Sequence, residues 1–243
     1  MEERFQRYFE VLEQLGAPKG DWKQGEIEIV TDPKLMLEAE ERSGQTVGVI
    51  DEDRFVLHLR DAVLFPPKVG STEPQLGTYI RFVYTYELQK NLGVFILPIN
   101  RHRQIVLNLT FRHALRRWVV EGCGTIAKSG EQRIETITRC VQQELGCDVI
   151  SYRKLTDYFI PERGLIGGLV PMYEVQVDFV PKEVDDPTVR GHTLMYPDDF
   201  FEAVNQGTIL IDGREYICCD GYTIAAVKMA THSFMAHEKI WLK

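Results

Sequence analysis

The sequence from Gly124 to Gly146 reads GTIAKSGEQRIETITRCVQQELG. Its second part, from Gln132 to Leu145, predicts a helix. Gly146 ends this helix, since glycine readily adopts the left-handed conformation found after helix C-termini. At ~100° per residue, positions 140, 143 and 144 share one helical face. Cys140, Gln143 and Glu144 occupy that face, so it carries one carboxylate, while Glu135 lies on the opposite side.

The chain outside this segment predicts strands before the helix, and strands followed by two helices after it. Partly alternating runs of β-branched and aromatic residues indicate strands, and apolar residues at i, i+3 and i+4 indicate helices. The predicted strands are 54–60, 78–86, 93–99, 104–110, 149–152 and 172–180, and the predicted helices are 5–15, 33–42, 132–145, 197–205 and 223–237. Proline and glycine make 65–74 a predicted loop. This order predicts an α/β sandwich with a mixed sheet.

Composition excludes several classes of protein. The chain has 243 residues and a net charge of −8, which argues against a general nucleic-acid binder but leaves room for a local site for a small anion. Its five cysteines form no C-x-x-C pair, so we expect reduced thiols rather than a disulfide framework or a zinc site. No apolar leader and no run of about 20 apolar residues is present, so we expect a cytoplasmic protein without a membrane span.

The segment from residue 124 to 146 resembles the Nudix box, G-x5-E-x7-R-E-U-x-E-E-x-G-U, in which U is aliphatic. Five positions match the box: Glu131, Arg139 (with seven residues between the two), Val141, Glu144 and Gly146. Three positions depart from it. Thr125 replaces the first glycine, and Cys140 and Gln143 replace two of the three helix glutamates. The box is therefore degenerate.

The flanking sequence is similar to ADP-ribose and nucleotide-sugar pyrophosphatases of the Nudix superfamily, over roughly Val47 to Ala236. The resemblance implies an α/β/α sandwich with a mixed sheet, and it implies a homodimer, because this subgroup often pairs through its N-terminal strands. Residues 1–46 are not matched. We therefore expect an N-terminal helical extension over 1–46 and a Nudix-like domain over 47–243.

The resemblance also implies roles for individual residues. Glu144, Arg139, Glu131 and, in a later acidic loop, Glu183 are the candidate catalytic residues; Glu144 and Glu131 are the candidate ligands of Mg²⁺ or Mn²⁺; Arg112, Glu121 and Arg116 are the candidate substrate-binding residues. The acidic loop could equally be a solvated surface, and Arg139 could pair instead with Glu135 one turn earlier.

Basic residues gather at 101–103 and at 112–117 in this acidic chain. Guanidinium groups bind phosphate through paired hydrogen bonds, so these residues suit a diphosphate ligand. Charged hairpin turns that serve only solubility explain them equally well.

The expected function depends on the two helix carboxylates that the degenerate box lacks. Mg²⁺ prefers hard oxygen ligands, and a cysteine thiol is soft. We expect a pocket for a nucleoside-diphosphate-linked ligand of the ADP-ribose or nucleotide-sugar type, with weak or absent hydrolysis and no required cofactor. Two alternatives stay open, an active Mg²⁺-dependent pyrophosphatase and an interaction protein without a ligand.

Overall fold

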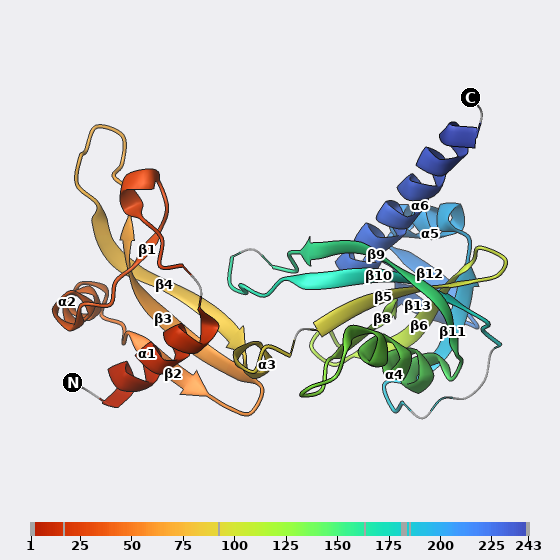
Figure 1. Ribbon diagram of the computed structural model, residues 1–243, viewed down its shortest axis with the longest axis horizontal. Coiled ribbons are helices and arrows are strands. Elements are labelled where there is room, and N and C mark those ends of the chain that lie inside the picture. The colour runs from red at the N-terminus through yellow and green to blue at the C-terminus, as the bar shows by residue number, and fades with distance from the viewer. Residues whose placement is uncertain are drawn as a thin grey trace. The chain divides into compact units, whose positions relative to one another are not determined.

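The computed structural model describes residues 3–16, 18–91, 93–162, 164–180, 184 and 186–241, without the side chains of Glu3 and of 232–241. The chain divides into two compact units (Figure 1). The first comprises Met1–Asn91 with Glu162–Gly168, and the second comprises Leu92–Pro161 with Leu169–Lys243. No helix in the described part of the chain is both long and apolar enough to cross a membrane.

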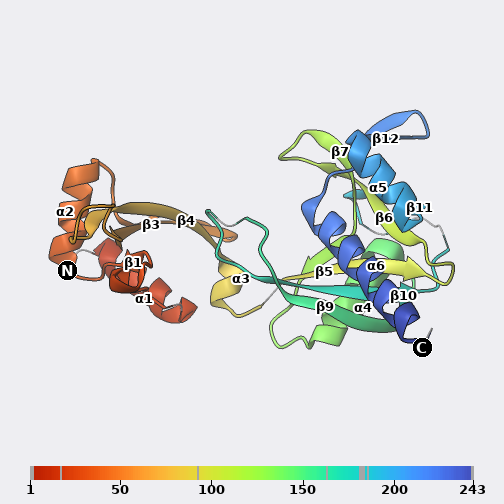
Figure 2. The same cartoon turned by 90° about the horizontal axis from the view of Figure 1, so that it is seen from above.

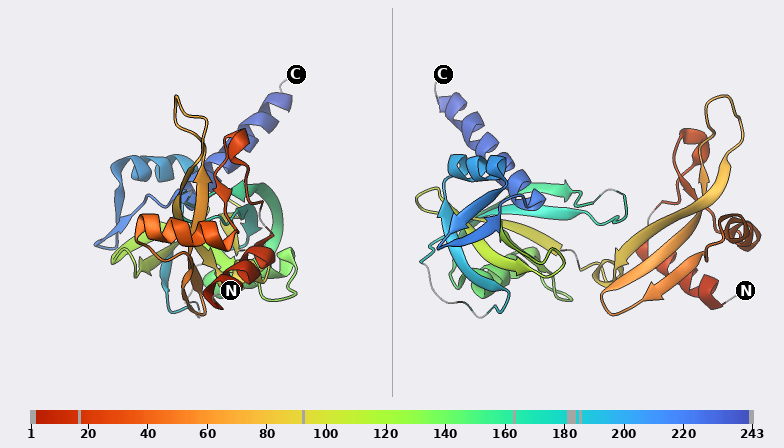
Figure 3. Two further views of the ribbon diagram at one scale, coloured as in Figure 1. Left: turned by 90° about the vertical axis from the view of Figure 1, so that its left-hand side faces the viewer. Right: turned by 180° about the vertical axis from the view of Figure 1, so that it is seen from behind.

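The first unit contains short helices around a four-stranded antiparallel sheet. Its elements are α1 (Glu3–Leu15), a 3-10 turn (Trp22–Gln24), β1 (Glu28–Ile29), α2 (Pro33–Ser43), β2 (Gly48–Glu52), β3 (Val56–Phe65), β4 (Gln75–Tyr84) and α3 (Thr85–Leu88). β3 pairs with β4 along its whole length and with β2 and β1 on its other edge (Figure 3). This pairing extends the predicted strand 54–60 to Phe65, and α3 ends the predicted strand 78–86 at Tyr84.

The helices of this unit cover one core. Phe5, Tyr8 and Val11 recur at helical spacing on α1 and are fully buried, together with Met36 of α2 and Leu57 of β3. Asp32 caps α2 by accepting hydrogen bonds from two backbone N–H groups. The compact units divide after Asn91, whereas the sequence predicts a boundary after residue 46. The reason is that β2, β3 and β4 pair with one another and pack against α1 and α2.

A buried ion pair lies inside the first unit. The guanidinium of Arg81 on β4 contacts both carboxylate oxygens of Asp61 on β3, at 2.6 and 3.1 Å. The hydroxyl of Tyr8 donates to Asp61 at 2.5 Å, and burial raises the pKa of that hydroxyl. Asp61 is 3% exposed, and Arg81 balances its negative charge within the core.

The second unit contains a nine-stranded mixed sheet. Its strands are β5 (Gly93–Asn100), β6 (Ile105–Arg112), β7 (Arg117–Glu121), β8 (Cys123–Ile126), β9 (Val149–Phe159), β10 (Val170–Val177), β11 (Val189–Met195), β12 (Thr208–Ile211) and β13 (Arg214–Ile217). The main order is β12-β13-β7-β6-β5-β10-β9, with β11 on β6 and β8 on β5. β10 runs parallel to β5, which makes the sheet mixed (Figure 2).

Helices cover both faces of this sheet. α4 (Arg133–Leu145) packs on one face, and α5 (Pro197–Gln206) and α6 (Gly221–Trp241) pack on the other (Figure 1). Side chains alternate between the faces along β10, where Tyr173, Val175 and Val177 join the α4 core and Met172 joins the α6 core. The predicted α/β/α sandwich with a mixed sheet is confirmed. Several strands were missed, and the predicted strand 149–152 extends to Phe159.

Candidate functional site

The helix of the box begins and ends through local contacts. At its start, the Glu135 carboxylate accepts from the N–H of Gln132, which completes a capping box with the side chain of Gln132. At its end, Gly146 takes a φ of 63°. Between them, one face of α4, including Ile137 and Val141, is buried against the sheet. The helix is therefore held at both ends, and the positions of its polar side chains are well defined.

Arg139 holds the loop before the helix. Its guanidinium contacts both oxygens of Glu131, at 2.7 and 2.8 Å, and donates to the Ile126 carbonyl oxygen at 2.9 Å. Its remaining nitrogen donates to Thr125 Oγ1 and to Gln143 Oε1. The pairing of Arg139 with Glu135 does not form. Arg139 thus joins three of the box positions singled out in the sequence, Thr125, Glu131 and Gln143.

The contacts of Glu131 leave its carboxylate engaged by protein donors. Besides Arg139, the hydroxyl of Thr136 and the N–H of Lys128 donate to it. The hydrogen bonds from Arg139 and then from Lys128 lower the pKa of Glu131 to about 2. The Glu131 carboxylate is held as an anion just before the start of α4, and its contacts order the loop that leads into this helix.

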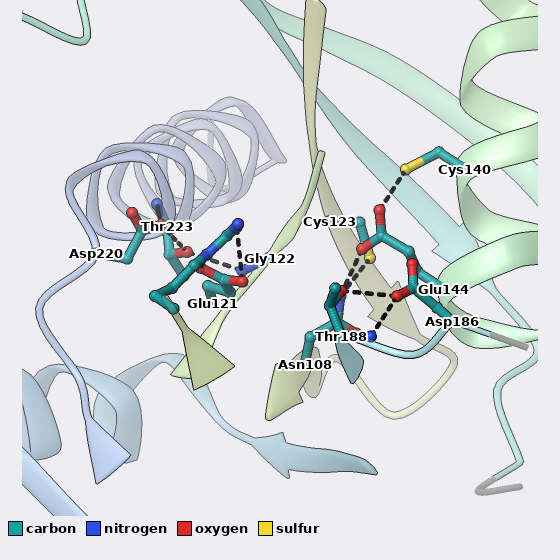
Figure 4. A network of polar contacts seen from close by, with 11 residues as sticks. Asn108, Glu121, Gly122, Cys123, Cys140, Glu144, Asp186, Thr188, Asp220 and Thr223 are labelled. Carbon is teal, nitrogen blue, oxygen red and sulfur yellow. Dashed lines mark hydrogen bonds and ion pairs between the residues drawn. The ribbon is translucent and has the colours of Figure 1, made fainter. Parts of the chain in front are cut away.

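Glu144 lies at the centre of a second network, drawn in Figure 4. The Cys140 thiol donates to its Oε1 at 3.2 Å, and Asn108 Nδ2 of β6 donates to its Oε2 at 2.6 Å. The same amide lies 3.6 Å from the sulfur of Cys123. All of these donors are neutral, and Glu144 makes no ion pair within the described chain. Burial therefore raises the pKa of the Glu144 carboxyl, and it raises those of the Cys140 and Cys123 thiols as well.

Two neighbouring segments complete the surroundings of Glu144. The negative charge of Asp186 further raises the pKa of Glu144, and Asp186 is itself fixed by the N–H and hydroxyl of Thr188 (Figure 4). His192 of β11 donates from Nε2 to the Glu144 carbonyl oxygen at 2.7 Å. The other amide atom of Asn108, Oδ1, is buried and has no hydrogen-bond partner among the residues that the structure describes. A buried acceptor without a donor is costly, so it suits a bound donor or cation.

A third polar group lies where β7 ends and α6 begins. Arg112 of β6 contacts both oxygens of Glu121, at 2.8 and 2.7 Å, and burial raises the pKa of this glutamate. Nearby, the Thr223 hydroxyl donates to Asp220 and accepts from the N–H of Gly122 (Figure 4). The guanidinium of Arg112 remains half-exposed and lies within electrostatic reach of Asp220 and Glu144. Among the described residues, Arg112 thus supplies a positive charge beside the carboxylates of Glu121, Asp220 and Glu144.

Two candidates from the sequence remain, Arg116 and Glu183. The guanidinium of Arg116 lies over the ring of Phe111 and contacts His113, in the turn between β6 and β7. Glu183 lies outside the described residues. Asn108 and His192 were not found from the sequence, whereas Asp186 belongs to the acidic loop that the sequence indicates around Glu183. Only Asn108 carried a signal, as a polar residue inside the apolar run of β6.

Comparisons with known proteins bear on this arrangement. No family model matches the sequence, and no curated protein matches it. Among solved structures, the chain is similar to an ADP compounds hydrolase, with a TM-score of 0.58 at 11% identity, over 79% of this chain and 93% of that one. The fold is of the Nudix type. This likeness concerns the fold, because 11% identity carries no activity from one chain to the other.

Within this Nudix-type fold, the donors present fit divalent metal poorly. No group of three His, Cys, Asp or Glu side chains that could hold an ion occurs in the described residues. Glu144, Asp186 and Asn108 Oδ1 are hard oxygens, but the thiols of Cys140 and Cys123 border the same space. Glu131 is engaged with Arg139. A site for two or three Mg²⁺ ions does not fit this set, so no catalytic step is assigned to one.

Proposed function

We propose that this chain binds a nucleoside-diphosphate-linked compound, of the ADP-ribose or nucleotide-sugar type, in the region bordered by Glu144 and Arg112, with weak or absent hydrolysis. The observation that carries the proposal is the partly buried Glu144 carboxylate, which accepts hydrogen bonds only from neutral donors within the described part of the chain. The Nudix-type scaffold, including the link between Glu131 and Arg139, is retained around it. On the box register inferred from the sequence, a thiol and an amide occupy two positions at which Nudix enzymes carry metal-binding carboxylates.

Three residues of this region provide different contacts for such a ligand. Arg112 holds Glu121 through its Nε and one Nη, and the exposed remainder of its guanidinium can donate hydrogen bonds to a phosphate. Asn108 Oδ1 offers a buried acceptor for a hydroxyl group of the ligand. Glu144 can carry a proton, because its pKa is raised, and in that form it does not repel an anionic ligand.

The test uses the purified full chain with and without Mg²⁺ or Mn²⁺. The probes are ADP-ribose, NAD, dinucleoside polyphosphates and nucleotide sugars, and the readouts are cleavage of the diphosphate bond, followed by the nucleotide that it produces, and the melting temperature. We expect a melting shift with one class of probe and little turnover. A probe at ~100 times its Kd stabilises the folded chain by about 2.7 kcal/mol.

Two variants locate the binding. Arg112→Lys keeps the charge but loses the fork, so it should weaken binding about tenfold, while Arg42→Gln, which alters an exposed ion pair in the first unit, should leave binding unchanged. Turnover that disappears in Glu144→Gln would favour the alternative of an active pyrophosphatase. Absence of any melting shift would favour a protein without a nucleotide ligand. The homodimer and the cytoplasmic location stay predictions.

A further inference from the structure

A cavity lies on the face of the nine-stranded sheet opposite to the network of Glu144. It has a volume of about 280 Å³ and lies among β5, β9 and β10. Its lining includes the polar and charged side chains of Asn100, Arg101, Arg103, Ser151, Arg153, Glu174 and Gln176. None of these residues belongs to the region around Glu144.

Strand register places this cavity on the α6 face. Glu174 and Gln176 alternate along β10 with Tyr173 and Val175, whose side chains pack in the α4 core. Arg153 of β9 lies opposite Glu174 and also donates to the Ala230 carbonyl oxygen of α6, at 3.4 Å. The sheet therefore separates the cavity from the network of Glu144.

The charge of the cavity favours an anion. Three arginines and one glutamate line it, so its walls carry a net charge of +2 in a chain with a net charge of −8. Glu174 is paired with Arg153. Arg101 pairs with Asp178, but both side chains of that pair are more than half exposed. An exposed ion pair contributes little free energy, so Arg101 can turn to a bound anion at small cost.

A fixed turn holds two of these arginines. Asn100 Oδ1 accepts from the N–H groups of His102 and Gln104, which locks the connection between β5 and β6. Within it, Arg103 takes a φ of 61°, a left-handed conformation that costs an L-residue free energy. The turn thus presents Arg101 and Arg103 at the rim of the cavity, facing Arg153 of β9.

The rest of the lining suits hydroxyl groups rather than an aromatic base. Ser151 donates to Gln176 at 3.1 Å, and both side chains can exchange this bond for bonds to a ligand. Tyr152 also borders the cavity, but its ring packs with Tyr173 of the other face, at 6.2 Å between centroids. A volume of 280 Å³ lies at the lower end of small-molecule sites.

We propose that this cavity binds a sugar phosphate, that is, a phosphomonoester of a small polyhydroxy compound. Arg101, Arg103 and Arg153 bind the phosphate, and Ser151 and Gln176 bind hydroxyl groups. The site is independent of the function proposed above. It accounts for the basic residues at 101–103, which the region around Glu144 does not include.

The experiment measures binding to the full chain by titration calorimetry. The probes are ribose 5-phosphate, inorganic phosphate, ribose and AMP. We expect ribose 5-phosphate to bind more tightly than the other three. The double variant Arg101→Gln, Arg103→Gln should weaken this binding more than tenfold, because each charge-assisted hydrogen bond contributes to affinity. The matched control is Arg117→Gln with Arg190→Gln, two exposed arginines of the same unit outside the cavity, and it should change binding less than twofold.

Several outcomes would overturn the proposal. They are absence of binding by ribose 5-phosphate, an equal loss in the control variant, equal affinity for inorganic phosphate, and tighter binding of AMP. The single variant Arg103→Lys, which keeps the charge, guards against a folding defect, and it should weaken binding less than the double variant. Glu144→Gln should leave this binding unchanged, so failure here and failure of the function proposed above are distinguishable.

Discussion

Each unit of the molecule holds a carboxylate inside a polar network, and the networks around Asp61 and Glu144 differ in charge. Asp61 in the first unit accepts from Arg81 and from Tyr8, so its negative charge has a cation in direct contact. Glu144 in the second unit accepts from a thiol and an amide, and no cation contacts it in the described chain. Asp61 is the more deeply buried of the two, and among the described residues only Asp61 has a cation in direct contact.

The difference separates a structural role from a binding role. A buried ion pair that satisfies its own hydrogen bonds leaves nothing for a ligand. A buried carboxylate that has only neutral donors keeps a raised pKa, and it gains when a proton, cation or polar ligand arrives. This contrast points to the second unit as the place of ligand binding.

The first prediction tests the paired carboxylate and has the largest effect. Asp61→Asn leaves the Arg81 charge buried without its partner, which should lower the free energy of unfolding by about 3–5 kcal/mol. Urea denaturation followed by circular dichroism measures it. The matched change Glu144→Gln strands no cation and should cost less than half as much. Equal losses in the two variants would remove the contrast between the networks.

The second prediction concerns a variant that turns the network around Glu144 into a site for a divalent metal ion. Cys140→Glu with Gln143→Glu adds two carboxylates beside Glu144, where like charges repel and the metal-free chain should become less stable. Mg²⁺ or Mn²⁺ at ~100 times its Kd should then raise stability by about 2.7 kcal/mol, with a much smaller effect on the parent chain. Melting curves at several metal concentrations test this. A variant whose metal affinity does not change would show that the box register assigned here is wrong.

The third prediction concerns pH. The pKa of Glu144 is raised from its ordinary value of 4.5, chiefly by burial, so the folded state holds this proton to higher pH than the unfolded state does. The stability of the parent chain relative to Glu144→Gln should therefore be greatest below about pH 4.5 and should fall as the pH rises through the raised pKa. Chemical denaturation from pH 4 to pH 8 gives both curves. Parallel curves would mean that the pKa of Glu144 is the same in the folded and unfolded states, which would contradict this prediction.

The fourth prediction is the smallest effect and concerns the link that orders the box loop. Arg139→Lys keeps the positive charge but cannot contact both oxygens of Glu131 and the Ile126 carbonyl together. We expect a loss of about 1 kcal/mol in the free energy of unfolding. Hydrogen exchange of residues 126–131 provides a local readout, since their amides should exchange faster in the variant. Unchanged exchange would mean that the capping box alone holds the loop.

Local signals explain what the sequence could predict. The helix predicted over 132–145 forms over 133–145, because its cap residues and its final glycine act within a few residues of the helix ends. The mixed sandwich could be predicted from the order of elements. Both results depend on short-range chemistry.

Pairing between distant residues explains what it could not predict. Asn108 lies 36 residues before Glu144, and only the fold of the sheet brings them together. The boundary after Asn91 depends on the pairing of β3 with β4, and the local sequence of a strand does not specify its partner. The region around Glu144 therefore required the structure, although Glu144 itself did not.

The left-handed backbone of Arg103 has a consequence for selection among variants. Glycine or asparagine would adopt a φ of 61° at lower cost, by about 1 kcal/mol, because neither suffers the full steric penalty of an arginine side chain there. A library screened for thermal stability alone should enrich those two residues at position 103. A library screened for anion binding should retain arginine. Position 103 would then be a point at which improving one property of the protein diminishes the other.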